Sequence, residues 1–309
     1  MSGEPTDSDR LDDTLRAHAE ACHSLWEAWL EIASQLAHPA PVTAPASGYA
    51  RAFTAKHAEA RPNIAFAAGQ YAGRYVSGMG AHVLGLAALV SAREFRLSYW
   101  AAVRAELELG GRVCWLIAPE KNGTLPEPDV QVARALMETL ADARRHAKRA
   151  KTTKLAPESR RFFNDAVAEV EADLTAVFPG WVLKGMPEEQ QEEADKWQIR
   201  GERYVGLSAG VKRFADFAFE GVPGLYDLLS AMAHPSIISL GILAPVRVDD
   251  GVAVAEYSLK LEDLESIVQL ACVAFYRAAM LVVTYFELDD SPLMAWSAAR
   301  LSWFSSAGE

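Results

Sequence analysis

The segment LYDLLSAMAHPS contains Tyr226, Ser230 and His234, three polar residues that follow one another at intervals of four. On an α-helix this spacing places the three side chains on one stripe. The next residue, Pro235, cannot donate a backbone N–H to a helix and disfavours helical geometry at the residue before it. We therefore expect His234 at the C-terminal end of a helix, where its imidazole can face a cavity and act as a general acid or base.

A second polar row, Arg104, Glu108 and Arg112, lies in the segment WAAVRAELELGGRVCWLIAP with the same spacing. An exposed Arg–Glu pair one turn apart contributes only about 0.3–0.5 kcal/mol, whereas an unpaired buried charge costs several kcal/mol. Apolar residues surround this row, so we expect its charges to be paired and the two polar rows to meet inside the fold. Three interpretations stay open: a buried structural network, a pocket for a small ligand, and a catalytic site.

These segments also resemble parts of known proteins. RAELELGGRVCWLIAPE, VARALMETLADARRHAKR and YDLLSAMAHPS, followed by a hairpin and a long apolar helix, resemble uncharacterised all-helical proteins common in actinobacteria. Over about residues 90–288 the pattern is distantly similar to HEPN-like helical domains. Several HEPN domains are metal-independent ribonucleases of toxin and antiviral systems, so the resemblance implies a defence or toxin-related setting.

The resemblance further implies a catalytic role for His234, with one departure. HEPN ribonucleases carry an arginine roughly one turn before the catalytic histidine on the same helix, but the segment DLLSAMA before His234 contains no arginine. If the chemistry is shared, His234 is the general acid or base for attack by a 2′-hydroxyl. Arg104 or Arg112 then reaches it across the fold to stabilise the phosphorane charge. Glu108, Ser230 and Tyr226 would support the same site.

Other chemical motifs in the sequence are incomplete. The segment EACH, Glu20–His23, has the Glu-x-x-His spacing of di-metal helical bundles, which need a second such motif and two further carboxylates. The sequence holds no second copy, so we expect no metal site and no cofactor. Ser230 has no G-x-S-x-G segment around it. The glycines of GQYAG and GLSAG lie in predicted helices and indicate close packing or kinks rather than phosphate binding.

The charge of the chain restricts nucleic-acid binding to a local patch. A net charge of −11 and a pI near 5.2 mean that the protein as a whole repels a phosphate backbone. The segment RRHAKRAKTTK gathers Arg144, Arg145, Lys148 and Arg149 at the end of a predicted helix, and these residues are the candidate RNA contact. A solvated helix end is the alternative, because the helix dipole favours cations there. The acidic run at 187–195 could also neutralise the patch within the chain.

Helical periodicity dominates the chain and predicts an all-α fold, a multi-helix bundle with one small β-hairpin insertion. We expect an N-terminal helix within 1–40, a Pro-rich linker at 41–48 and a bundle domain over 49–309. The hairpin is expected at about 243–259, where apolar and polar residues alternate around Asp250 and Gly251. Bundle helices are predicted at about 64–90, 92–118, 127–150, 158–177, 188–199, 206–219 and 261–288.

The leading functional hypothesis is a cytoplasmic interaction or regulatory protein without catalysis. The first nine residues lack the basic and apolar regions of a secretory signal. Arg74 interrupts the most membrane-like stretch, 64–92, so no membrane partner is expected. Trp296 and Trp303 lie seven residues apart on a terminal helix, which suits a protein partner or a homodimer. A HEPN-like ribonuclease and a small-ligand-binding bundle are the alternatives.

Overall fold

The computed structural model describes residues 7–93, 98–120, 123–181, 197–219, 246–249, 252–255 and 261–300, together with Asp227. Its helices are α1 (Asp7–Gln35), α2 (Pro45–Lys56), η1 (Pro62–Phe66), α3 (Ala67–Ser91), α4 (Ser98–Ile117), α5 (Pro128–Thr152), α6 (Pro157–Val177), α8 (Leu207–Ala218), α11 (Leu261–Phe286) and α12 (Ser291–Ala298). Helices hold most of the described residues, which confirms the predicted all-α bundle with a small β insertion.

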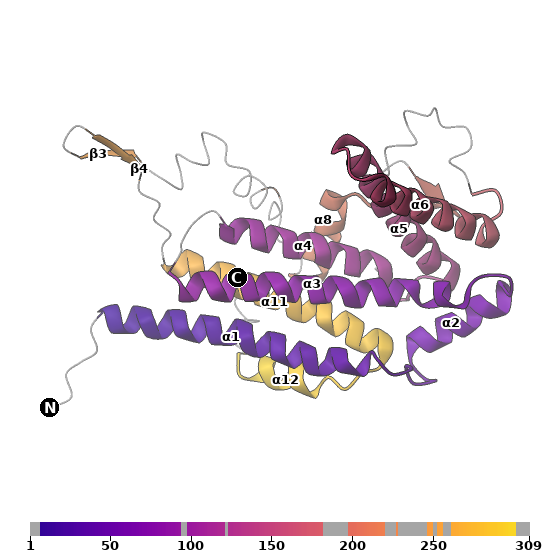
Figure 1. Ribbon diagram of the computed structural model, residues 1–309. Helices are drawn as coiled ribbons and strands as arrows, with labels where there is room; N and C mark the ends of the chain where they lie inside the picture. Colours follow the sequence, from indigo (N-terminus) through magenta and orange to yellow (C-terminus); the bar gives the residue numbers. More distant parts are fainter. Residues whose placement is uncertain are drawn as a thin grey trace.

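Four long helices form the body of the molecule. The helices α1, α3, α4 and α11 run alongside one another, and α11 contacts each of the other three (Figure 1). The short helix α8 packs on α4, and α12 packs back on α1. The helices α5 and α6 form a hairpin at one end of the body, where α5 contacts α2, α3 and α4.

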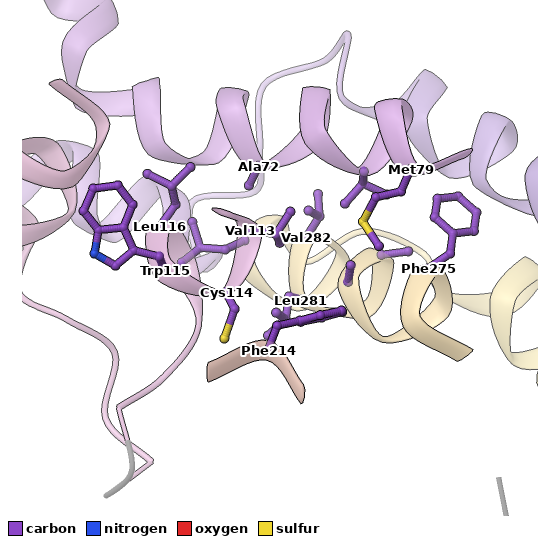
Figure 2. Packing of buried hydrophobic residues seen from close by; sticks show 14 of the residues in the cluster. Ala72, Met79, Val113, Cys114, Trp115, Leu116, Phe214, Phe275, Leu281 and Val282 are labelled. Carbon is purple, nitrogen blue, oxygen red and sulfur yellow. The ribbon is translucent and has the colours of Figure 1, made fainter. Parts of the chain in front are cut away.

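A single apolar core joins these helices. Trp29 and Ile32 of α1 have no exposed surface and belong to the same buried cluster as residues of α3, α4 and α11. Figure 2 shows Met79, Val113 and Phe275 directed into this cluster from α3, α4 and α11. The N-terminal helix is therefore one of the core helices of the bundle, and it packs directly against the region predicted as a separate bundle domain.

The second helix was not predicted from the sequence. It begins at Pro45, inside the segment 41–48 that was expected to be a linker. Proline is well tolerated in the first turn of a helix, because its missing N–H has no intrahelical acceptor there. Only Ala46, Ala50 and Phe53 are buried along this helix. Such a short stripe of mostly small residues gives little periodic signal.

The described strands form two small hairpins. The strand β3 (Val246–Asp249) pairs antiparallel with β4 (Val252–Ala255), which confirms the hairpin predicted at about 243–259. A second hairpin pairs β1 (Gln198–Ile199) with β2 (Glu202–Arg203). This pair corrects the end of the helix predicted at 188–199. Its strands are too short to show alternation in the sequence.

Glycines bring α4 and α8 into close contact. A Cβ atom at Gly111 would lie 2.6 Å from the carbonyl carbon of Gly210, so only glycine allows the two backbones to approach this closely. At the neighbouring Gly110 the space of a Cβ is taken by the ring of Phe214. Gly210 ends the GLSAG segment, and its contact with Gly111 confirms that this segment serves helix packing.

One described helix has the length and apolar composition of a membrane span. It is α11, with a mean hydropathy of 1.8 in its most apolar window, and 72% of that window is buried inside the bundle. Burial on nearly every face is characteristic of a central helix in a globular core. The position of α11 between α1, α3 and α4 agrees with this assignment.

Candidate functional site

The predicted row of Tyr226, Ser230 and His234 lies outside the described residues, so its meeting with the second polar row stays a prediction. The residues of the second row, Arg104, Glu108 and Arg112, lie in two different environments. Arg104 Nε donates to Glu108 Oε1 at 2.9 Å, and the two side chains are 19% and 22% exposed. Arg112 is almost fully buried and pairs with groups from other elements.

Arg112 belongs to a buried polar network between α3, α4 and α5. Its Nη1 donates to the carbonyl of Val205 at 2.6 Å and lies 3.2 Å from Glu138 Oε2. The hydroxyl of Tyr75 donates to Glu138 Oε1 at 2.8 Å, and the Arg112 guanidinium lies 5.0 Å from the ring centre of Tyr204. Burial, followed by the charge of Glu138, raises the pKa of both tyrosines. The phenols therefore stay protonated, and this network is structural.

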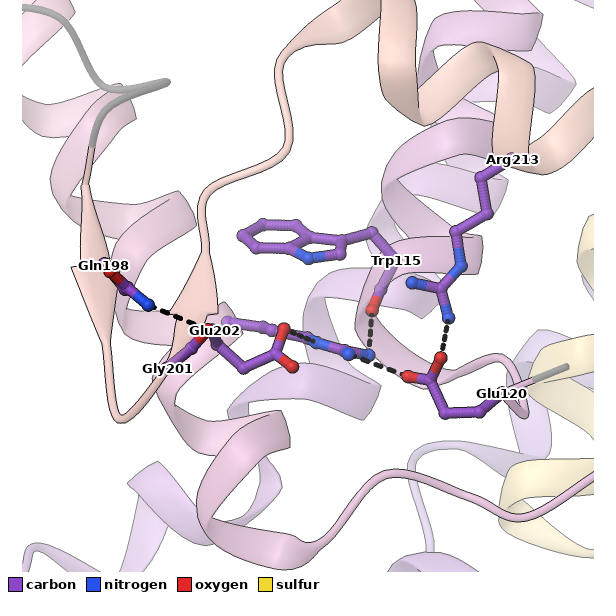
Figure 3. Close-up of polar contacts among 7 residues, drawn as sticks. Trp115, Glu120, Gln198, Gly201, Glu202 and Arg213 are labelled. Carbon is purple, nitrogen blue, oxygen red and sulfur yellow. Dashed lines mark hydrogen bonds and ion pairs between the residues drawn. The ribbon is translucent and has the colours of Figure 1, made fainter. Parts of the chain in front are cut away.

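A second buried arginine ties the end of α4 to the β1–β2 hairpin. Arg134, 3% exposed in its side chain, donates to the carbonyl of Trp115 at 2.8 Å, to Glu120 at 2.8 Å and to Glu202 at 2.9 Å (Figure 3). Arg213 of α8 lies 3.3 Å from the other oxygen of Glu120. Three of the five guanidinium donors are thus satisfied by protein groups. Arg134 thus links four parts of the chain: α5, the end of α4, the loop after α4 and β2.

Asp129 in the first turn of α5 contacts three basic side chains. Its carboxylate is 5% exposed and contacts Lys56, His57 Nε2 at 3.1 Å and Arg200 Nη1 at 2.9 Å. Burial alone would raise the pKa of this carboxyl, but hydrogen bonds from Lys56 and His57 lower it. The cluster joins α2, α5 and the β1–β2 hairpin, so its role is also structural.

A candidate for ligand binding is an open, mostly apolar cleft of about 770 Å³ beside the end of α1. It is lined by the loop from α1 to α2, by the first half of α3 and by the C-terminal end of α11. Leu36, Pro39, Phe66 and Phe286 supply apolar walls. The volume falls within the roughly 300–1,000 Å³ typical of small-molecule sites, which are mostly apolar with a few polar groups.

Two glycines on α3, one turn apart, form part of the cleft wall. A Cβ atom at Gly69 would lie 2.8 Å from the ring of Tyr285, and one at Gly73 would lie 3.3 Å from Leu36. The absent side chains let α11 approach α3 at Gly69 and let Leu36 lie close to α3 at Gly73, on the cleft wall. The GQYAG segment was expected to serve packing, and its glycines also shape this cleft.

The polar groups of the cleft differ in what they bind. Gln35 is held at the Asp289 backbone, since it accepts from the Asp289 N–H at 3.0 Å and donates to the Asp289 carbonyl at 3.4 Å. Glu287 accepts a hydrogen bond from the hydroxyl of Thr43. Arg74, which is exposed, pairs with no carboxylate of the described residues. Its guanidinium is therefore the charged group of the cleft that can receive an anionic ligand.

The four residues of the predicted basic patch differ in their surroundings on α5. Arg144 Nη2 donates to Glu171 at 2.7 Å, and its guanidinium lies 5.3 Å from the ring centre of Trp197. Lys148 lines a groove between α5 and α6, while Arg145 and Arg149 are exposed. Of the four residues, Arg144 is thus paired within the fold, and Arg145, Lys148 and Arg149 are exposed.

Glu106 of α4 is a buried carboxyl that sequence reasoning missed. It has no exposed surface, and neither oxygen has a hydrogen-bond partner among the described residues. Burial, and then the nearby Cys22, raises its pKa well above the usual value. The Sγ atoms of Cys22 and Cys272 lie 3.6 Å apart in the same region. Within the described ranges, no group of three or more His, Cys, Asp or Glu side chains is placed to hold a metal ion.

The periodicity of α4 contained the signal for Glu106. This residue follows Val103 by three positions and precedes Gly110 by four, so it lies on the buried face of the helix. The cleft had no such signal, because its walls come from three segments far apart in the chain. Comparisons with protein-family models, with curated proteins and with solved structures found no match to this chain.

Proposed function

We propose that this protein is a non-catalytic ligand-binding bundle, and that its cleft between α1, α3 and α11 holds a small, largely apolar molecule with an anionic group. The observation that carries this proposal is an open apolar cleft of about 770 Å³ whose wall holds Arg74, an arginine that pairs with no carboxylate of the described ranges. An arginine offers several N–H donors in a planar arrangement that matches a carboxylate. The apolar part of the ligand would lie against Leu36, Phe66 and Phe286.

The charges around the cleft favour an anionic ligand over a cationic one. Glu287, the acidic residue of the lining, already accepts a hydrogen bond from Thr43. A bound cation would leave Arg74 facing a like charge. A bound carboxylate or sulfonate would instead gain a charge-assisted hydrogen bond, which is stronger than a neutral one.

The test measures binding of two fluorescent probes that share an apolar ring system. One is anilinonaphthalene sulfonate, which is anionic, and the other is N-phenyl-1-naphthylamine, which is neutral. Arg74→Ala should weaken binding of the sulfonate roughly ten-fold, as expected for removal of a charged hydrogen bond, and leave the neutral probe almost unchanged. Arg203→Ala, at an exposed position in β2, is the matched control and should change neither.

A second variant tests whether the probes bind in the cleft or on another apolar surface. Gly73→Leu places a side chain in the cleft, and the nearest obstacle is the flexible end of Leu36, at 3.3 Å from the new Cβ. This variant should weaken both probes. If each probe binds Gly73→Leu as tightly as it binds the wild type, the probes bind outside the cleft, and the proposal is contradicted. A mass spectrum of the native protein would also detect a retained ligand.

The cellular setting of this function is proposed from the sequence. A cytoplasmic regulatory protein suits an acidic chain whose most apolar helix is a buried core helix. The HEPN resemblance offers a ribonuclease as the alternative, with His234 as its acid or base. The cleft supports ligand binding more directly, because each residue that the ligand would contact has a described position.

A further inference from the structure

The chain around the turn between α5 and α6 carries a charge opposite to that of the whole chain. From Arg144 to Arg161 the sequence contains eight lysines and arginines and one acidic residue, Glu158, a net charge of +7. The full chain has a net charge of −11. The positive charge is local, because Asp165, Glu169, Glu171 and Asp173 follow on α6, and it gives a basic patch to a molecule that otherwise repels phosphate.

The cations of this hairpin surround a groove. A cavity of about 1010 Å³ lies between the last turns of α5 and the first turns of α6. Lys148 and Lys151 line the α5 side, and Arg160 and Arg161 line the α6 side together with one acidic residue, Asp165. All four basic side chains belong to exposed residues. Lys151, Arg160 and Arg161 have no ion pair with the described residues, unlike Arg144, which is bound to Glu171.

An exposed aromatic side chain follows these cations in the sequence, beside the residues that line the groove. Phe162 follows Arg161 directly and is 67% exposed, although a side chain of this size is normally buried. Its ring is edge-on to Phe163, with 5.4 Å between the ring centres, and Phe163 is itself stacked on His146 at 5.3 Å. The two inner rings therefore support Phe162 while leaving most of its surface open.

We propose that the groove between α5 and α6 binds single-stranded nucleic acid, with backbone phosphates between Lys151 and the pair Arg160 and Arg161, and a base stacked on Phe162. A groove with cations on both walls suits one sugar–phosphate strand, whereas a duplex or a membrane presents a broad charged face. Cationic grooves with adjacent aromatic platforms are the recurrent means of binding single strands without sequence preference. This proposal is independent of the ligand cleft.

The test measures fluorescence anisotropy of a labelled single-stranded oligouridine with the full-length chain. Arg160→Ala combined with Arg161→Ala should weaken binding at least ten-fold. It should also reduce the slope of log Kd against log salt concentration by roughly 1.4, since each phosphate that an arginine neutralises on a single strand adds about 0.7 to that slope. Lys212→Ala combined with Arg203→Ala removes two exposed cations elsewhere and is the matched control. The control should bind like the wild type.

The aromatic contact is tested separately. Phe162→Ala should weaken binding between about five-fold and 160-fold, the range for removal of one stacked base, while Phe162→Trp should retain it. The changed residues are exposed, so the melting temperatures should stay near that of the wild type. Three results would each overturn the proposal: no binding of the oligouridine at 50 mM salt, equal binding by the Arg160/Arg161 double variant, or tighter binding of phosphatidylserine vesicles or duplex RNA than of the single strand.

Discussion

Arg112 of α4 and Glu138 of α5 form an ion pair across 3.2 Å, and each side chain is only 7% exposed. Two charges buried together lose their hydration, and their attraction offsets this cost only when the remaining polar atoms also find partners. Tyr75 and the Val205 carbonyl provide such partners. The pair therefore joins three helices, and each charge depends on the other.

Replacing one member of this pair should destabilise the fold strongly. Arg112→Met keeps much of the apolar stem but leaves Glu138 as an uncompensated buried charge, and should lower the free energy of unfolding by about 3–5 kcal/mol. Urea unfolding followed by circular dichroism measures this change. Arg16→Met, which removes an exposed partner of Asp13, is the control and should cost less than about 1 kcal/mol. Combining Arg112→Met with Glu138→Leu should recover part of the stability, and a double variant with no recovery would argue against the pairing.

Glu106 should make the stability of the protein depend on pH. Its pKa is raised in the folded state by burial and then by Cys22. Between the ordinary value of 4.5 and that raised value, the folded state holds a proton that the unfolded state has released. The free energy of unfolding should therefore fall as the pH rises through this interval.

Glu106→Gln removes this titration and keeps the size of the side chain. In thermal melts from pH 4.5 to 8, the melting temperature of the variant minus that of the wild type should increase as the pH rises. Glu27→Gln, at an exposed position of α1, should give a curve parallel to the wild type. If the Glu106→Gln curve is also parallel, the folded pKa of Glu106 is not raised.

Replacing glycine by alanine should destabilise the protein at Gly111, where the backbone of Gly210 is in contact, and stabilise it at Gly48, where a Cβ would meet nothing. Gly111→Ala would place a Cβ 2.6 Å from backbone atoms of α8 and should lower the free energy of unfolding by about 1–3 kcal/mol. Gly48→Ala is the matched change in α2, where a Cβ would meet nothing within 4 Å. It should stabilise the protein by roughly 0.5–1 kcal/mol, the helix preference of alanine over glycine. Chemical denaturation of both variants would show whether their effects have opposite signs.

The ribonuclease alternative makes a separate prediction for His234. Our proposed function has no catalytic step, so labelled RNA incubated with the purified chain and a metal chelator should stay intact. His234→Ala should give the same gel pattern as the wild type. Cleavage by the wild type that is absent from His234→Ala would establish the alternative and would reject a purely binding function.

The sequence predicted the helices and one hairpin well because their signals are local. A 3.6-residue apolar period extends over α3, α4, α5 and α11. The limits of α3, α5 and α11 were expected within three residues, whereas α4 begins at Ser98, six residues after its predicted start. Alternation around Asp250 and Gly251 indicated the β3–β4 hairpin. The helix α2 and the β1–β2 hairpin were missed, because their apolar patterns are too short to separate from those of a loop.

The partners of charged residues could not be predicted in the same way. Arg104, Glu108 and Arg112 were predicted as one row, yet Arg112 pairs with Glu138, a residue of another helix. Repeats of four residues drift around a helix that has 3.6 residues per turn, so Arg104 and Arg112 point in different directions. Which carboxylate meets Arg112 then depends on how α4 and α5 pack.

An acidic, all-α chain with a basic segment after residue 143 follows from composition and helical periodicity, which can be read along the chain without knowledge of its packing. Which charged side chains remain accessible to a ligand depends on how the helices pack. Packing joined Arg144 to Glu171, left Arg160 and Arg161 beside a groove, and brought Arg74 to the wall of a cleft between segments more than 200 residues apart. The groove and the cleft are formed by residues that come together only when the chain folds, so the sequence pattern of any one segment cannot indicate them.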